Sequence, residues 1–315
     1  MAKKIIAVAG ATGAQGGGLT RAILDDPNGG YTARALTRDP NSDKAKALAK
    51  AGAEVVGANV DDVGSLVNAF KGADAAYCVT FFWEHFSPQK ETEQAKNLAM
   101  AAKEAGVKHV IWSTFEDTRK SVPLSSNQMP TLQGKYKVPH FDSKADADHY
   151  FTDAGLPVTF LLTSFYWDNL IFFGLGPKKG PDGKLAITFP LGDKKMPSIA
   201  AGDIGGCAYG IFKRGSEFIG KAVGVAGEHL TGAKMASDLT QALGQPVAYN
   251  AVPPDVYRSF GFPGADDLGN MFQFKADFES LYCGNRPLAL SRELNPKLQT
   301  FAQWLAANKD RIPLG

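Results

Sequence analysis

The sequence has few of the residues that build metal centres, disulfide frameworks or membrane spans. Its 315 residues include only three cysteines, at positions 78, 207 and 283, and these form no C-x-x-C pair. Neither a zinc site nor a disulfide framework is therefore expected, and free thiols suit a reducing cytoplasm. None of the five histidines stands four residues from another, as a helical metal site requires. We expect no metal.

Long hydrophobic runs and an excess of charge of one sign are also missing. The first apolar run, residues 4–9, stops at a glycine loop, so it predicts neither a signal segment nor a membrane span. The formal net charge is only +2 and is spread along the chain, which argues against an obligate nucleic-acid partner. These absences favour a cytoplasmic protein that binds neither nucleic acid nor a membrane.

What the chain does contain is a regular alternation of short apolar runs and helical segments. This rhythm is typical of an α/β fold with a doubly wound parallel sheet of Rossmann type. We expect a dinucleotide-binding domain over residues 1–163 and a smaller α+β lobe over residues 164–315, from which the sheet can receive a further strand. A hairpin is expected at residues 178–189. The predicted strands are residues 4–9, 31–37, 54–58, 75–80, 109–113 and 158–163, and helices are predicted at residues 17–26, 42–51, 89–105 and 141–154.

The glycine loop after the first predicted strand indicates a phosphate site. Free N–H groups at a helix N-terminus attract a pyrophosphate, and glycines let it approach closely. Gly10 would make the tight turn, Gly13 the close approach, and Gly16 the packing of helix on strand. The predicted cofactor-binding residues of this loop are Gly10, Ala11, Thr12, Gly13, Ala14, Gln15 and Gly16.

The tip of the second predicted strand bears on which dinucleotide binds. An acidic residue there favours NAD, whereas a basic residue accommodates the 2′-phosphate of NADP. Arg38 occupies the tip and favours NADP(H), although Asp39 beside it keeps NAD open. Asn59, Val60 and Asp62 would lie near the adenine, with helix capping as the alternative for Asp62. The residues expected along the ribose are Val79, Thr80 and Phe81.

Several motifs together resemble the NmrA-like family, a group of atypical short-chain dehydrogenases/reductases. They run in order along nearly the whole chain: the glycine loop, Leu-Thr-Arg-Asp-Pro at 36–40, Trp-Glu at 83–84, His-Phe-Asp-Ser-Lys at 140–144, Asp-Asn-Leu at 168–170 and Phe-Pro-Gly-Ala-Asp at 262–266. The resemblance implies an NADP-binding protein, because the family includes NADP-binding regulators or redox sensors and has reductases among its relatives. It also implies that Phe165, Tyr166 and Trp167 contact the nicotinamide end, with an aromatic core as the alternative.

The proton relay of active short-chain reductases is incomplete in this sequence. Those enzymes use a Tyr-x-x-x-Lys pair and a serine, and here Lys144 and Ser113 stand at the lysine and serine positions while His140 replaces the tyrosine. His140 is either a substitute proton donor or a packing residue, and Lys144 supports binding as well as catalysis. The only Tyr-x-x-x-Lys, at 209–213, is far from the predicted strands of the site and is interpreted as coincidence.

Two functions follow from this pattern. An intact dinucleotide site beside an incomplete relay favours a redox sensor or regulator that acts through a protein partner or self-association, with residues 114–139 as a responsive loop. The alternative is an NADPH-dependent reductase of a carbonyl, quinone or similar acceptor. The sequence names neither substrate nor partner.

Overall fold

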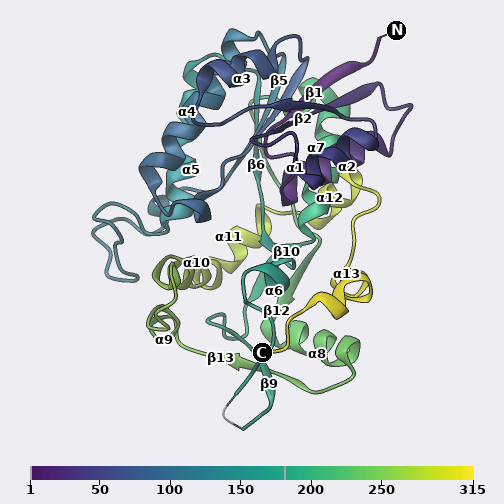
Figure 1. Ribbon diagram of the computed structural model, residues 1–315. Helices are drawn as coiled ribbons and strands as arrows, with labels where there is room; N and C mark the ends of the chain where they lie inside the picture. The colour runs from purple at the N-terminus through teal and green to yellow at the C-terminus, as the bar shows by residue number, and fades with distance from the viewer. Residues whose placement is uncertain (1, 181) are drawn as a thin grey trace.

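The structure is a computed structural model that describes residues 2–180 and 182–315. The chain forms two parts, one above the other in Figure 1. The upper part is built on a parallel sheet, and the lower part combines small sheets with helices. The N-terminus lies at the top of this view, and the C-terminus lies within the lower part, above β9.

The upper part is a seven-stranded sheet in which all neighbouring strands are parallel, in the order β11-β6-β5-β4-β1-β2-β3. The order reverses at β1, so a ligand is expected beyond the carboxyl ends of β1 and β4. The predicted doubly wound Rossmann-type fold is confirmed, and the seventh strand comes from the C-terminal half. The strands are β1 (Lys4–Val8), β2 (Tyr31–Thr37), β3 (Glu54–Gly57), β4 (Ala75–Cys78), β5 (His109–Thr114), β6 (Val158–Leu162) and β11 (Ala222–Gly224).

Helices cover both faces of this sheet. Apolar side chains from α3, α4 and α5 form one core with the strands, and those from α1 and α7 form another. Helices α1 and α7 approach closely because both are rich in glycine: a Cβ at Gly205 would lie 1.9 Å from the backbone N of Leu19. The helices are α1 (Ala14–Leu24), α2 (Asp43–Lys50), α3 (Val63–Phe70), α4 (Pro88–Glu104), α5 (Pro139–Asp153) and α7 (Ala201–Arg214).

The lower part has its own core of aromatic and aliphatic side chains. Two three-stranded sheets, β12-β10-β7 and β13-β9-β8, pack with helices around this core. The predicted hairpin is present as β8 and β9, although Pro181 in its turn is outside the described residues. The elements are β7 (Phe165–Tyr166), α6 (Asn169–Phe172), β8 (Lys178–Lys179), β9 (Leu185–Phe189), β10 (Lys195–Ile199), β12 (Glu228–Thr231), α8 (Gly232–Leu243), β13 (Val247–Ala251), α9 (Pro254–Arg258), α10 (Ala265–Asp277), α11 (Glu279–Gly284) and α13 (Phe301–Asn308). Helix α12 (Leu288–Leu294) returns to the upper part and packs against α7.

The predicted elements lie close to the observed ones, with shifts mainly at their ends. The first helix begins at Ala14 rather than at residue 17, and the fourth strand ends at Cys78 rather than at residue 80. The glycines expected to end three helices, Gly52, Gly106 and Gly155, all have positive φ. Short 3-10 turns complete the chain: η1 (Phe82–Glu84), η2 (Thr118–Lys120), η3 (Gly215–Phe218) and η4 (Lys309–Arg311). Within the described residues, no helix combines the length and apolarity that crossing a membrane requires.

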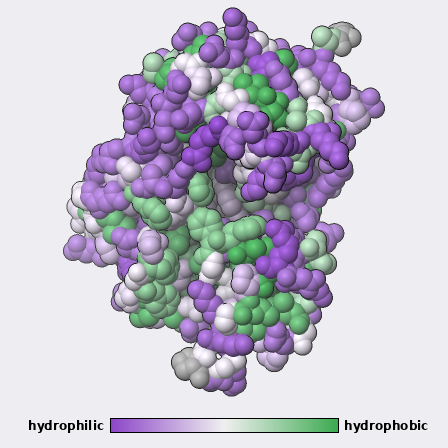
Figure 2. Space-filling model, viewed as in Figure 1, coloured by the Kyte–Doolittle hydropathy of each residue, from purple (hydrophilic) through white to green (hydrophobic). Residues whose placement is uncertain are grey.

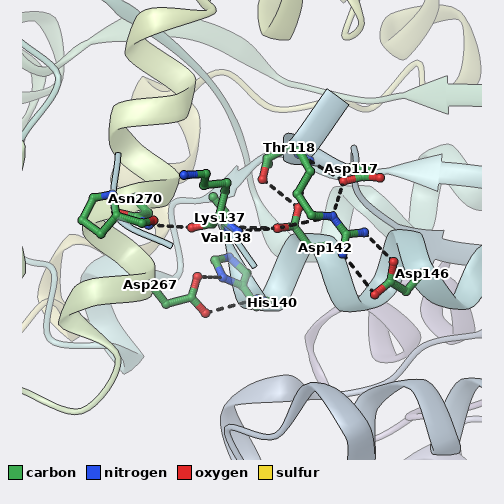
Figure 3. Close-up of polar contacts among 11 residues, drawn as sticks. Asp117, Thr118, Lys137, Val138, His140, Asp142, Asp146, Asp267 and Asn270 are labelled. Carbon is green, nitrogen blue, oxygen red and sulfur yellow. Dashed lines mark hydrogen bonds and ion pairs between the residues drawn. The ribbon is translucent and has the colours of Figure 1, made fainter. Parts of the chain in front are cut away.

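Residues 114–139, expected to form a responsive loop, are fastened to α5 by one carboxylate (Figure 3). Asp142 accepts bonds from the N–H and hydroxyl of Thr118 at 2.8 and 2.7 Å, and from the N–H groups of Lys137 and Val138 at 2.8 and 3.1 Å. Asn270 of α10 donates to the carbonyl of Lys137 at 2.6 Å. The two ends of the loop are thus joined at one buried side chain, and the loop is tied to α10 as well.

Candidate functional site

The first turn of α1 forms a cradle that only glycine permits. Gly10 has φ +64°, and a Cβ at Gly16 would lie 2.5 Å from the carbonyl oxygen of Gly10. Gly13 is the N-cap of α1 and provides no side-chain cap, so the first N–H groups of the helix remain available to a ligand. Gly10 therefore makes the predicted tight turn, and Gly16 allows the predicted close packing of helix on strand.

The surface is hollowed between the two parts of the molecule, with apolar residues gathered below the hollow (Figure 2).

The side chain of Gln15 forms hydrogen bonds with residues of three strands, β4, β5 and β7. Its oxygen accepts from the hydroxyl of Ser113 at 2.9 Å and from that of Tyr77, and its amide donates to the hydroxyl of Tyr166 at 2.6 Å. Burial raises the pKa of Tyr166 to about 12, so this phenol stays protonated at neutral pH. The hydroxyl of Ser113 therefore donates its hydrogen bond to Gln15, and the hydroxyl of Tyr166 is linked to the glycine loop through the same side chain.

Arg38 lies at the rim, beyond the end of β2, where its guanidinium is 2.5 Å from Glu84 of η1. Both side chains are exposed, so this ion pair is weak in water and a phosphate can compete for the arginine. Glu84 belongs to the segment that follows β4, so the pair joins the end of β2 to that segment.

Lys144 on α5 is buried in a polar cluster at the end of β4. Its Nζ lies 2.6 Å from Glu91 on α4 and donates to the hydroxyl and carbonyl of Thr80 at 2.6 and 3.2 Å. The Lys144 ammonium, with hydrogen bonds from Thr80 and the nearby His85, lowers the pKa of the fully buried Glu91 to about 2 despite desolvation. Glu91 therefore holds Lys144 at the strand end through an ion pair, and sequence reasoning missed this partner.

His140 lies at the start of α5 and pairs with a carboxylate from the other half of the chain (Figure 3). Its Nδ1–H donates to Asp267 of α10 at 2.6 Å, and its backbone N–H donates to the second oxygen of the same carboxylate at 3.2 Å. Both residues are buried. Within the part of the chain that the structure describes, Nε2 of His140 makes no hydrogen bond. Asp267 thus fixes the ring and the tautomer and leaves Nε2 for a ligand.

Aromatic rings surround His140. Trp83 is 4.7 Å from its ring centre, Phe82 is at 5.9 Å and Phe115 at 6.1 Å. Trp83 and Phe86 also lie against Gly264, just before α10, where a Cβ would be 2.9 Å from the Trp83 ring. This wall is apolar and partly exposed at Phe86, so it suits a planar, uncharged ligand.

The remaining predicted site residues divide between the cleft and the core. Val79 lies beside Gly10: a Cβ atom placed on Gly10 would be 3.3 Å from the side chain of Val79. Phe81 is exposed, and Asp62 is the N-cap of α3.

Phe165 and Trp167 are buried in the lower core, which is the packing alternative considered for them. Asn59 and Val60 lie between β3 and α3, and both form local polar contacts there, Asn59 with Asp61 and Val60 with Asn97.

Two features set aside in the sequence lie away from the cradle. Tyr209 and Lys213 both contact Asp26, just beyond the C-terminal end of α1, at 3.2 and 3.3 Å. This Tyr-x-x-x-Lys pair therefore helps to pack α7 against α1.

Cys78 is fully buried in β4, and burial raises the pKa of its thiol, so it stays an inert core residue. Among the described residues no group of three or more His, Cys, Asp or Glu side chains could hold a metal ion.

Comparisons with known proteins agree with this geometry. The sequence model of the NmrA-like family matches residues 2–305. An NmrA-like oxidoreductase, FrzB, of Cladobotryum is 28% identical over 302 residues, covering 90% of this chain and 87% of that protein. NmrA, a negative transcriptional regulator solved with NADP, aligns with TM-score 0.77 and 23% identity over 97% of this chain and 95% of its own. The Citrobacter triphenylmethane reductase, solved with NADP(H), aligns with TM-score 0.74 and 18% identity over 97% and 99% of the two chains.

Proposed function

This chain belongs to the NmrA-like family, and from that premise we propose that it binds NADP(H) and reduces a carbonyl or quinone-type acceptor. The observation that carries the proposal is the buried pair of His140 and Asp267 at the position where the tyrosine of active short-chain reductases is missing. Sequence reasoning favoured a sensor because the relay is incomplete. A histidine oriented by a carboxylate can exchange a proton through its second ring nitrogen, and this supports a reductase.

The residues present fit a dinucleotide. The glycine cradle is open where a Cβ would fill it, and α1 has no side-chain cap at its N-terminus. Arg38 stands at the end of β2, where the 2′-phosphate of NADP would lie. NmrA and the triphenylmethane reductase have both been solved with such cofactors.

The proposed chemistry divides between cofactor and protein. Bound NADPH would supply the hydride. In its doubly protonated form the ring of His140 would donate the Nε2 proton to the acceptor oxygen, while Asp267 accepts from Nδ1–H and stabilises the positive ring. Lys144, paired with Glu91, places its ammonium group at the end of β4. The aromatic wall excludes water from the acceptor.

The function is tested by following NADPH absorbance with purified protein and a panel of carbonyl and quinone acceptors. Arg38→Ser is expected to raise KM for NADPH by about 10–100-fold with little effect on NADH, because a charged hydrogen bond to the 2′-phosphate is lost. Glu84→Gln is the matched control: it removes the competing carboxylate of the same ion pair, and KM for NADPH should fall. Absence of oxidation with every acceptor contradicts the reductase, and equal losses for NADH and NADPH contradict the role of Arg38.

A sensor is the second candidate, favoured by the link between Arg38 and the lower part. Glu84 pairs with Arg38, and Trp83 and Phe86 of the same segment lie against Gly264. A 2′-phosphate that takes Arg38 from Glu84 would loosen this segment and thereby report cofactor occupancy to α10.

Hydrogen exchange measures this coupling. NADP+ is expected to increase amide exchange at residues 82–86 and 262–266 more than NAD+ does, because only NADP+ competes with Glu84. In Glu84→Gln the exchange should already be high and respond equally to both dinucleotides. Identical exchange with NADP+ and NAD+ in the wild-type protein would rule out the coupling.

A further inference from the structure

A cavity of about 270 Å³ lies at the edge of the parallel sheet where the strands begin, opposite the glycine cradle. Four strands begin in its wall, at Lys4, Tyr31, Ala75 and His109, and the end of α7 and η3 form the remaining side. No residue of the glycine loop or of the proposed acceptor site lines it. The space is sufficient for a planar ring system, since a cavity of about 150 Å³ already binds benzene.

His109 brings an acceptor without a partner to this cavity. The residue is only 8% exposed, and its Nε2 lies 2.9 Å from the hydroxyl of Thr159. That hydroxyl donates its own proton to the carbonyl of Phe218 at 2.9 Å, so Nε2 carries the proton that joins the ring to Thr159. Nδ1 is therefore the acceptor nitrogen, and no hydrogen bond to it is found within residues 2–180 and 182–315. Burial lowers the pKa of His109 to about 4, so the ring stays neutral at pH 7.

Asp74 adds a second acceptor to the same wall. Its Oδ2 accepts from the N–H of Ile5 at 2.8 Å, whereas Oδ1 has neither a hydrogen bond nor an ion pair with any residue that the structure describes. Burial and the nearby charge of Asp74 raise the pKa of Tyr31. The Tyr31 hydroxyl donates to the carbonyl of Phe212 at 3.0 Å, so its proton is not directed to Asp74. The wall thus holds two acceptors that lack a donor.

Aromatic rings and two lysines complete the cavity. Phe212 lies edge-on to His109, with ring centres 5.2 Å apart, and Tyr31 lines the same wall. Lys4 and Lys108 are exposed at the rim and form no ion pair with another described residue. Aromatic rings suit the face of a planar base, and exposed ammonium groups suit a phosphate.

We propose that this cavity is a second ligand site, which binds a guanine nucleotide. The pairing edge of guanine carries two adjacent N–H donors, at N1 and N2, and these match the acceptors of Asp74 and His109. Ser216, in the same wall, has a hydroxyl that can donate to the guanine O6. Adenine instead presents one donor beside the bare acceptor N1, which would face the carboxylate. The two rim lysines hold the phosphate, and the site is independent of the proposed reductase activity.

Calorimetric titration of the full-length protein with GMP, AMP and guanosine tests the site. Saturating NADP+ is present throughout, so that the nucleotides are kept out of the cleft at the glycine loop. We expect GMP to bind at least about tenfold more tightly than AMP, because AMP loses a hydrogen bond to a charged acceptor. Equal affinity for GMP and AMP, or no binding of GMP at millimolar concentration, would overturn the proposal. So would a GMP affinity that falls as NADP+ is raised.

Asp74→Asn assigns the binding to the cavity. The asparagine oxygen still accepts from the N–H of Ile5, but the amide turns a donor toward the donors of guanine. GMP affinity should therefore fall by about 10–100-fold, while circular dichroism and NADP+ affinity remain those of the wild type. Wild-type affinity for GMP in Asp74→Asn would show that the nucleotide binds elsewhere, and this conclusion holds whether or not NADP+ binds.

A rim lysine provides a second variant that leaves the base contacts intact. Lys108→Gln should weaken GMP binding by about two- to fivefold, as expected for an exposed ion pair, and leave guanosine unchanged. Lys184→Gln is the matched control, because it removes an exposed lysine of the lower part, and it should affect neither ligand. Equal losses for GMP and guanosine in Lys108→Gln would contradict the placement of the phosphate at the rim.

Discussion

Replacing His140 by glutamine is expected to slow acceptor reduction by about 10²–10⁴-fold, the usual contribution of a positioned acid. Glutamine retains an N–H that can donate to Asp267, so the buried carboxylate keeps a partner. What it lacks is an ionisable ring that can release a proton. The affinity for NADPH should change by less than about threefold, because the cradle and Arg38 are untouched. Steady-state kinetics together with calorimetric titration of NADPH separate the two effects.

Asp267→Asn is the companion variant for this prediction. It preserves the shape of the side chain but weakens the hold on Nδ1, so kcat should fall while KM for NADPH stays constant. Its loss should be smaller than that of His140→Gln, because the proton donor itself is still present. If His140→Gln turns over at the wild-type rate, the proton comes from another group and His140 is a packing residue. If both variants lose NADPH binding to the same extent as turnover, the pair has a structural role alone.

Replacing Lys275 by methionine is expected to increase the free energy of unfolding at pH 6–7 by a few kcal/mol. Methionine is unbranched, fills the space of the lysine stem and makes favourable contacts with aromatic rings. It also removes a buried amine that has no hydrogen-bond partner among the described residues. Urea unfolding of both proteins measures the difference.

The stabilisation by Lys275→Met should shrink as the pH rises. Below about pH 7 the amine is protonated in both folded and unfolded wild-type protein, so the full cost of burying a charge is present. Above that pH the folded amine loses its proton while the unfolded one keeps it up to about 10.4. Wild-type stability therefore rises by at most about 1.4 kcal/mol per pH unit through this group, and the advantage of the variant falls accordingly.

A matched substitution distinguishes this effect from a general benefit of methionine. Lys137 is equally buried, but its amine donates to two carbonyls. Lys137→Met leaves those carbonyls without their partner, so it should lower stability. A Lys275→Met protein less stable than the wild type at pH 6, or one whose advantage is constant between pH 6 and pH 9, would show that the amine is charged and satisfied in the folded state.

The sheet and the glycine loop were predictable because their signals are local. A strand, a glycine turn and a helix start follow one another within residues 4–24, and each βα unit repeats this pattern of apolar run and amphipathic helix. Gly10 and Gly16 have the tight turn and close packing that their spacing predicts. The sequence also predicts roles for His140, Lys144 and Arg38 from their positions in family motifs.

Their partners were not predictable in this way. Asp267 is 127 residues from His140, and it lies one position beyond the family motif that ends at Asp266. Glu91 is a helix residue whose burial against Lys144 follows only from how α4 and α5 pack. No local pattern marks Lys275 as buried, since a lysine near the end of an amphipathic helix is usually exposed.

The sequence by itself determined the order of strands and helices and the place of the glycine cradle at the start of α1, because both depend on residues adjacent in the chain. The tertiary structure decided which charges meet, which remain unpartnered and how far each is removed from water. Those properties set the chemistry of His140, Lys144 and Lys275, and they arise only when α10 packs against α5 across the junction of the two parts. Long-range packing determines the dielectric environment and the hydrogen-bond partners of a side chain, and neither is encoded in its immediate neighbours.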